Sequence, residues 1–359
     1  MLSLYWCFVV NVLFCAPVSL AASKKPWKLD NFKNLVAFGD SYTDEGRTAY
    51  IGAHDGEVPP LGYIQGVSSS TSTGGYIWPR YVSWYTNSTL YNYGVSGAVC
   101  SNNITPRSSS IPKAPFKDMA TYAVPTFIKD LAYAKSLPQN ETNDILECYP
   151  DNTVYSLWIG TNDLGNDGFI TDSQLPNKTI PDYLDCVYQQ IEELYENAGA
   201  RYFVLMNAAP LHLAPQYALP ERGGLPSTDF WGNKGTNLTE ISFRMKGQVG
   251  LVNEAFGWRT PGERLVEGKW DGLKIAVFDV GALMTDIYTN PTTYLNGTGP
   301  PNVTGTSKGS CTGNCTTADP DSYMWYDALH PSEQTSRIVA KEFAKVVRGE
   351  GKWGSWWGA

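Results

Sequence analysis

Five short runs of apolar residues, rich in β-branched and aromatic side chains, recur along the chain and predict buried strands. They are continuous rather than alternating, which is typical of a parallel sheet covered by helices on both faces. The segments between them repeat apolar residues with helical periodicity. The predicted strands span residues 35–38, 89–95, 153–159, 202–206 and 274–280. The predicted helices span residues 76–85, 122–137, 180–197, 238–258 and 332–348, with Ser332 as the expected N-cap of the last one.

This pattern indicates an α/β fold of one domain, residues 22–359. No Pro/Gly/Ser-rich linker separates two independent core patterns, and the sequence has no internal repeat. The chain is long for one domain, and the surplus lies in the segments 46–75, 102–120, 209–236 and 290–322. Long loops after the carboxyl ends of parallel strands are where such folds place their substrate sites.

The amino terminus predicts a signal peptide, residues 1–21, and therefore a secreted protein. An uncharged apolar run spans residues 2–20, and small residues stand at Ser19, Ala21 and Ala22. A membrane anchor is the alternative, but the run contains Asn11 and Pro17 and barely reaches spanning length. No other stretch is long or apolar enough to span a bilayer, so we expect no membrane association.

Eight Asn-x-Ser/Thr sequons support export and predict N-linked glycans. They begin at Asn87, Asn103, Asn140, Asn177, Asn237, Asn296, Asn302 and Asn314.

Five cysteines follow the predicted signal peptide, and some should pair in an oxidising compartment. They are Cys100, Cys148, Cys186, Cys311 and Cys315. Cys311 and Cys315 lie four residues apart and could close a small ring. The pairing of the other three stays open, and an odd number leaves at least one thiol free or bonded to another molecule.

The formal net charge of −8 and the lack of a basic cluster argue against nucleic acid and against an anionic membrane surface as partners. The chain also holds 12 Trp and 22 Tyr residues. Aromatic faces stack on sugar rings, which hints at a carbohydrate ligand, although packing accounts for most of them.

Candidate chemistry begins after the first predicted strand, in the sequence Gly39-Asp40-Ser41. The chain turns there and leaves Ser41 at the carboxyl edge of the sheet. A serine hydroxyl is a poor nucleophile unless a base and a group that orients the base are within reach. Alone, this tripeptide fits an ordinary strand-ending turn just as well.

The base and its orienting group can come from Asp327 and His330. These two residues are three positions apart, just before the last predicted helix. His330 can take a proton from Ser41, and Asp327 can orient and stabilise the imidazole ring. Of the other histidines, His54 lies in a polar loop and His212 has no acid three residues before it.

Two further strand ends carry possible donors to an oxyanion. Asn162 follows the third predicted strand in Gly160-Thr161-Asn162, and its amide can donate to a developing negative charge. Gly97 lies just beyond the second predicted strand, where a glycine lets a backbone N–H approach a ligand closely.

Together these segments resemble the motifs of the GDSL, or SGNH, hydrolases, and the resemblance spans residues 35–348. It implies a three-layer α/β/α sandwich around a five-stranded parallel sheet, the triad Ser41, Asp327 and His330, and oxyanion donors from Ser41, Gly97 and Asn162. Tyr42 stands where the motif has leucine. No metal or organic cofactor is implied.

Within that family, the secretion signal, the long loops and the Trp-rich composition look most like fungal acetyl esterases of carbohydrate esterase family sixteen. The resemblance implies a secreted serine esterase that removes acetyl groups from xylo-oligosaccharides. Two alternatives stay open: a GDSL lipase or phospholipid acylhydrolase, and a catalytically inactive sugar-binding protein. The tail could also bind sugar through Trp353, Trp356 and Trp357. So short a segment is too small for a binding module, and we expect it to pack on the body of the protein instead.

Overall fold

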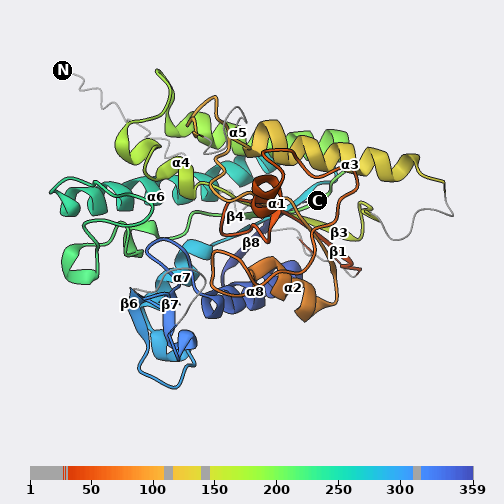
Figure 1. Cartoon of the computed structure of the whole chain (residues 1–359). Coiled ribbons are helices and arrows are strands. Elements are labelled where there is room, and N and C mark those ends of the chain that lie inside the picture. The colour runs from red at the N-terminus through yellow and green to blue at the C-terminus, as the bar shows by residue number, and fades with distance from the viewer. Residues whose placement is uncertain are drawn as a thin grey trace, which may run out of the picture.

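The computed structural model describes residues 27, 29, 31–108, 116–138, 146–309 and 317–358. Its centre is a six-stranded sheet of order β2-β1-β3-β4-β5-β8 (Figure 1). The first five strands are parallel, as predicted, and β8 is antiparallel to β5. The strands are β1 (Asn34–Gly39), β2 (Thr89–Asn92), β3 (Thr153–Trp158), β4 (Tyr202–Met206), β5 (Lys274–Phe278) and β8 (Gly354–Trp357).

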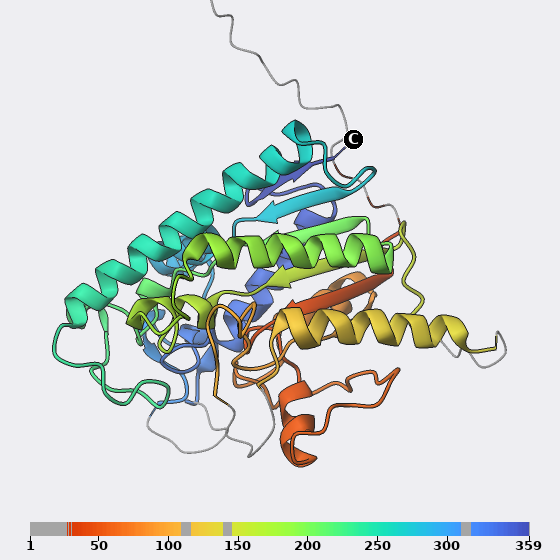
Figure 2. The same cartoon turned by 90° about the horizontal axis from the view of Figure 1, so that it is seen from above.

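Helices cover both faces of the sheet, so the fold has the three layers that the apolar runs predicted. The long helices α3, α5 and α6 lie on one face, and α2, α7 and α8 lie on the other (Figures 1 and 2). The helices are α1 (Arg47–Ala53), α2 (Trp78–Thr86), α3 (Val124–Ser136), α4 (Thr161–Leu164), α5 (Ile180–Ala198), α6 (Leu238–Pro261), α7 (Val280–Thr289) and α8 (Glu333–Val347). A short π-helix, Met119–Ala123, leads into α3.

The order of the strands brings separate segments of the sequence to one edge. Strand β1 lies between β2 and β3, all running in the same direction, so their carboxyl ends meet. All six residues of β1 and of β3 are buried, which is why their sequences are apolar without alternation. Ser332 is the N-cap of α8, as predicted, and its Oγ accepts the N–H of Thr335.

The sixth strand was not predicted. β8 pairs with β5 through Trp356 and Trp357, and the indole N–H of Trp356 donates to the carbonyl oxygen of Val346 at 3.0 Å. The tail therefore packs on the body of the protein, as its shortness suggested. A four-residue strand gives too little alternation to be recognised in a sequence.

Three further elements, helix α7 and a pair of strands, were not predicted. Helix α7 begins at Val280, which the prediction placed at the end of a strand, because the Asp279 carboxylate accepts the N–H of Ala282 and caps a helix there. Strands β6 (Asn302–Thr306) and β7 (Tyr323–Trp325) form a separate two-stranded sheet.

One disulfide, Cys100–Cys186, joins the segment after β2 to helix α5. Cys148 is a buried free thiol, and burial raises its pKa to about 12. The predicted signal peptide, the Cys311–Cys315 ring and the sequons at Asn140 and Asn314 fall outside the described residues. Within the described ranges, every helix is too short or too polar to cross a membrane.

Candidate active site

Ser41 follows strand β1 at the carboxyl edge of the sheet. The chain turns tightly there, because the Asp40 carbonyl oxygen accepts the backbone N–H of Asp44 at 2.9 Å. The Asp40 carboxylate also accepts the N–H of Tyr42 at 2.9 Å. Gly39 is required at this point, since a Cβ atom there would collide with a backbone carbonyl oxygen of β3. The turn thus fixes the Ser41 backbone.

His330 and Asp327 lie beside this serine. His330 Nε2 is 2.8 Å from Ser41 Oγ, and His330 Nδ1 is 2.9 Å from both carboxylate oxygens of Asp327. Asp327 Oδ1 also accepts the backbone N–H groups of Leu329 and His330 at 2.9 and 2.8 Å. These bonds fix the carboxylate, which in turn fixes the imidazole ring with Nε2 directed at the hydroxyl.

Two contacts hold the serine turn against its neighbours. The Tyr42 hydroxyl donates to the carbonyl oxygen of Leu329 at 2.6 Å, which joins the residue after Ser41 to the residue before His330. The Ser72 hydroxyl donates to the carbonyl oxygen of Ser41. The motif's usual leucine could not make the first of these bonds.

Gly97 occupies the turn that follows β2. The N–H of Ala98 donates to the carbonyl oxygen of Val95 at 3.0 Å, and Gly97 has a φ of +81° inside that turn. Such a backbone conformation favours glycine. A Cβ atom at Gly97 would also press on the Phe116 ring, which would have to move to make room for it.

Asp44 ties the serine turn to the Gly97 turn. Its Oδ2 accepts both the N–H of Ser96 at 2.9 Å and the Ser96 hydroxyl at 2.8 Å. Its Oδ1 accepts the N–H groups of Gly46 and Arg47, each at 2.8 Å, at the start of α1. One buried carboxylate therefore sets the position of the glycine relative to the serine.

Asn162 lies in the short helix α4, just after β3, and its side chain is buried. Its Nδ2 donates to the Ala98 carbonyl oxygen at 2.9 Å, next to Gly97. An amide nitrogen carries two hydrogens, so one remains for a ligand. The neighbouring Asp163 accepts the N–H of Cys100 at 3.1 Å with both oxygens. The Asn162 and Gly97 segments are thus joined at two points.

The buried carboxyl groups beneath the site differ in their acidity. Burial raises the pKa of Asp40 to about 6, although the N–H of Tyr42 opposes the rise. Burial likewise raises the pKa of Asp163 to about 7. For Asp327 burial acts in the same direction, but the His330 ring and the backbone N–H groups outweigh it and leave its pKa below the ordinary value. Asp327 is therefore the carboxylate held in its charged form beside the imidazole.

Phe230, which the sequence did not single out, lies against the imidazole. The Phe230 and His330 ring centroids are 5.1 Å apart with the planes at 75°, and Asn166 Nδ2 donates to the Phe230 carbonyl oxygen at 2.9 Å. Phe230 belongs to the long segment 209–236, which was expected to contribute to the site, but nothing in its spacing marks this one aromatic residue.

The other two histidines have different surroundings. His54 Nδ1 lies 2.8 Å from the carbonyl oxygen of Tyr50, and its ring stacks on the Tyr50 ring. Burial lowers the pKa of His212 to about 4, with Lys246 acting in the same direction. Neither is placed as His330 is, between a serine and an aspartate.

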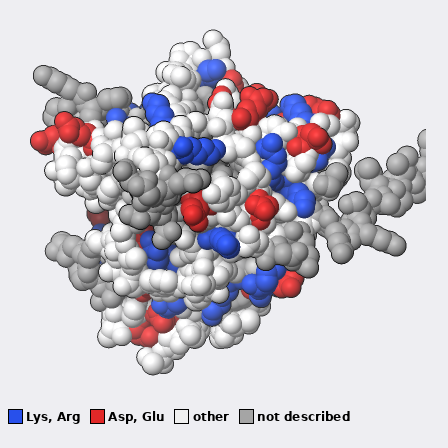
Figure 3. Space-filling view, turned by 90° about the vertical axis from the view of Figure 1, so that its right-hand side faces the viewer, with Lys and Arg blue, Asp and Glu red and all other residues white. Residues whose placement is uncertain are grey.

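The described part of the chain shows neither a large charged surface nor a metal site that would suggest a different function. Lys and Arg lie among Asp and Glu on the face drawn in Figure 3, without a large area of one sign. Within the described ranges, no group of three or more His, Cys, Asp or Glu side chains is placed to hold a metal ion.

The sequence matches the family model described as GDSL-like lipase/acylhydrolase over residues 35–343. The chain belongs to this family. It is a carboxylic ester hydrolase, with a mostly parallel sheet between helical layers.

Two fungal relatives of this hydrolase are acetylesterases. That of Hypocrea jecorina is 38% identical over 94% of this chain and 95% of its own length. That of Thermothelomyces thermophilus is 26% identical over 88% of this chain and 89% of its own length. Among solved structures, an acetylxylan esterase from Geobacillus stearothermophilus has a TM-score of 0.34 and 13% identity, covering 91% of this chain and 98% of that one. This overlap is too loose to bear on the substrate.

Proposed function

We propose that this hydrolase is a secreted esterase that removes acetyl groups from carbohydrates, with acetylated xylo-oligosaccharides as its substrate class. The observation that carries the proposal is the contact of 2.8 Å between Ser41 Oγ and His330 Nε2, with Asp327 on the other ring nitrogen. That arrangement gives a serine hydroxyl the base and the orienting group that nucleophilic catalysis needs.

The reaction has two steps. His330 Nε2 takes the proton of the Ser41 hydroxyl as the oxygen attacks the ester carbonyl carbon, and a tetrahedral intermediate forms. The imidazolium then gives that proton to the leaving sugar oxygen, which leaves an acetyl-serine. A water molecule gives a proton to the same nitrogen and attacks this ester, which forms a second tetrahedral intermediate. As that intermediate breaks down to acetic acid, the imidazolium returns the proton to Ser41 Oγ. Asp327 keeps the proton of His330 on Nδ1 and stabilises the charged ring throughout.

The negative charge on the tetrahedral oxygen needs donors. We assign these to the backbone N–H groups of Ser41 and Gly97 and to the second amide hydrogen of Asn162. The bond from Asn162 to Ala98 supports this assignment, because it holds the amide next to the Gly97 turn before substrate arrives. Donors already in place cost no reorganisation when the charge develops.

Acetate as the acyl group is supported by the acetylesterases of the two fungi, one of them 38% identical to this chain. Secretion is supported by the apolar run at residues 2–20 and by the eight sequons. We place the mature protein at residues 22–359, as one domain that carries N-linked glycans and needs no metal or organic cofactor.

The test is a comparison of acetyl, butyryl and octanoyl 4-nitrophenyl esters, alongside acetate release from acetylated xylo-oligosaccharides. If the acyl pocket is closed around acetate, each methylene group added to the acyl chain overpacks it. This raises the free energy of the bound substrate by about 1–3 kcal/mol. We expect kcat/KM to fall steeply from acetyl to butyryl, with little activity on octanoyl esters. Activity that rises toward octanoyl, or sugar acetates left intact, would favour a lipase instead.

A further inference from the structure

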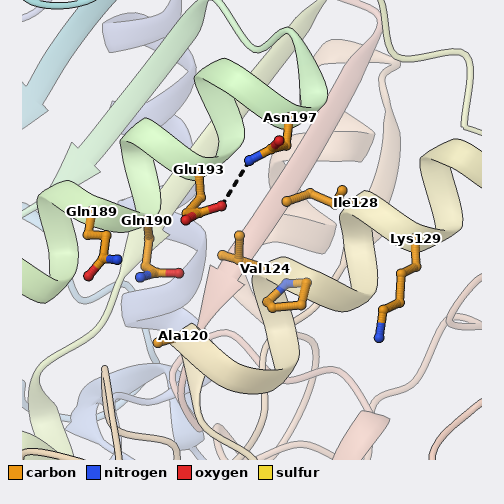
Figure 4. A pocket seen from close by; sticks show the side chains of 9 residues that line it. Ala120, Val124, Ile128, Lys129, Gln189, Gln190, Glu193 and Asn197 are labelled. Atoms are coloured by element: carbon orange, nitrogen blue, oxygen red, sulfur yellow. Dashed lines mark hydrogen bonds between the residues drawn. The ribbon is translucent and has the colours of Figure 1, made fainter.

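Two adjoining cavities lie on the helical face made by α3 and α5 and contain none of the residues assigned to catalysis. Their volumes are about 330 and 300 Å³, and Ala120 and Gln189 line both. Each is at the lower end of the range for small-molecule pockets. We call the pair the α3–α5 groove; the first cavity is drawn in Figure 4.

The two walls of the first cavity differ in chemistry. Val124 and Ile128 of α3, beside Lys129, form an apolar surface, and polar side chains of α5 face them (Figure 4). These are Gln190, Glu193 and Asn197. Asn197 donates to Glu193 at 2.9 Å, which orients both side chains. A sugar ring has an apolar C–H face and an edge of hydroxyl groups, so it matches both walls at once.

Gln190 indicates that the groove is built to receive a hydrogen-bond donor. Its side chain is only 3% exposed, and its Nε2 donates to the Cys186 carbonyl oxygen at 3.3 Å. Its Oε1 is buried without a hydrogen-bond partner among the described residues. An unpaired buried acceptor costs stability, and a sugar hydroxyl or acetamide N–H would satisfy it.

An attachment point for a sugar lies in the wall of the second cavity. Asn103 lines that cavity, is exposed, and begins the sequon Asn103-Ile104-Thr105. Thr105 is buried, and its hydroxyl donates to Asp163 at 3.0 Å. The disulfide from Cys100 to α5 holds this segment against the helix that forms the polar wall. A sugar on Asn103 would therefore begin at the second cavity, which adjoins the first.

We propose that Asn103 carries an N-linked glycan whose first sugars lie in the α3–α5 groove. In the transfer, Asn103 Nδ2 forms a bond to C1 of the first N-acetylglucosamine, a polyprenyl diphosphate leaves, and the amide loses one proton. The glycan covers the apolar wall and gives Gln190 Oε1 its donor. This inference rests on the proposed export of the protein and is independent of its esterase activity.

The experiment uses the full chain secreted from a yeast. Glycopeptide mass spectrometry measures the occupancy of each sequon, and endoglycosidase H, which cuts between the first two sugars, is then added to the native protein. Asn296 is the matched control, because it is an exposed sequon that lines neither cavity. We expect Asn103 to be occupied and its glycan to be released at least about tenfold more slowly than that of Asn296, because the groove must open first. After denaturation the two rates should be equal.

Variants separate the groove from general folding effects. Gln190→Leu keeps the size of the side chain and removes the acceptor, so release at Asn103 should become faster while release at Asn296 stays the same. Asn103→Gln should lower the melting temperature more than Asn296→Gln. If Asn103→Gln is not secreted, the native release rates of the parent protein and of Gln190→Leu still decide the question.

Three results would overturn the inference. If Asn103 carries no glycan while Asn296 carries one, the groove glycan does not exist and the proposed export still stands. Equal native release rates at the two sites show that the Asn103 glycan lies in solvent. If every sequon is empty in protein exported by the yeast, both the groove glycan and the proposed glycosylation fail, whereas the esterase assay is unaffected.

Discussion

The Tyr42 hydroxyl donates to the carbonyl oxygen of Leu329 at 2.6 Å, a bond between residues 287 positions apart in the sequence. Tyr42 follows Ser41, and Leu329 precedes His330. The Tyr42 ring also lies edge-on to the His330 ring, with the centroids 5.8 Å apart. One side chain thus sets the distance between the proposed nucleophile and its base.

Tyr42→Phe should therefore reduce turnover without removing any group that reacts. The variant leaves a buried carbonyl oxygen without a donor, which costs about 1–3 kcal/mol of stability. The loosened His330 loop should lower kcat by about ten- to a hundredfold, since small errors in placement are costly in catalysis. We expect KM for 4-nitrophenyl acetate to change little.

Tyr188→Phe is the matched control for this prediction. It removes another buried tyrosine hydroxyl, which lies 2.6 Å from Thr260 Oγ1 and touches no residue assigned to catalysis. Both variants should lower the melting temperature, and only Tyr42→Phe should lower kcat. An equal loss of kcat in the two would mean that Tyr42 acts through overall stability alone.

Asn162→Ala should slow turnover by about a hundredfold with little change in KM, because an oxyanion donor acts mainly in the transition state. Asn253→Ala serves as the control, since Asn253 Nδ2 also donates to an alanine carbonyl oxygen, that of Ala208, at 2.9 Å. Steady-state kinetics on one acetate ester measures both. A change confined to KM in Asn162→Ala would assign this amide to ground-state binding.

Sequence patterns predicted those parts of the fold and site that local features determine. The five parallel strands could be recognised because each is a continuous apolar run, and Ser41, Asn162 and Gly97 follow the ends of three of them. Asp327 and His330 share one short segment before a capped helix.

The remaining features depend on contacts between distant segments. Phe230 reaches His330 from a long loop, and the disulfide between Cys100 and Cys186 spans 86 residues. Neither contact leaves a periodic pattern in the sequence. Strand β8 exists because β5 offers it an edge, which the tail sequence alone cannot indicate.

The buried Asp40 carboxyl should make the protein less stable as the pH rises. Its pKa is about 6 in the folded chain against 3.8 in the unfolded chain, so between these values the folded state holds more protons. The contribution of Asp40 to the free energy of unfolding should then be fully present below about pH 4 and be lost as the pH rises through about 6. Asp40→Asn keeps an acceptor for the Tyr42 N–H and should flatten this fall.

Urea unfolding at several pH values between 4 and 7 measures the effect. Asp172→Asn is the control, because Arg244 lowers the pKa of that exposed carboxyl and its contribution is lost only as the pH drops below the unfolded value. It should leave the slope between pH 4 and 6 unchanged. A slope in Asp40→Asn equal to that of the parent protein would show that Asp40 titrates normally.

The central claim is that Ser41 carries the acyl group, and acid quenching during turnover of an acetate ester tests it most directly. The peptide that contains Ser41 should gain one acetyl group in the parent protein, detected by mass spectrometry. Ser41→Ala should show no acetylation and a turnover lower by about four orders of magnitude, as expected for loss of a triad nucleophile. Turnover of Ser41→Ala within about tenfold of the parent, or acetyl groups found only on another residue, would contradict the account.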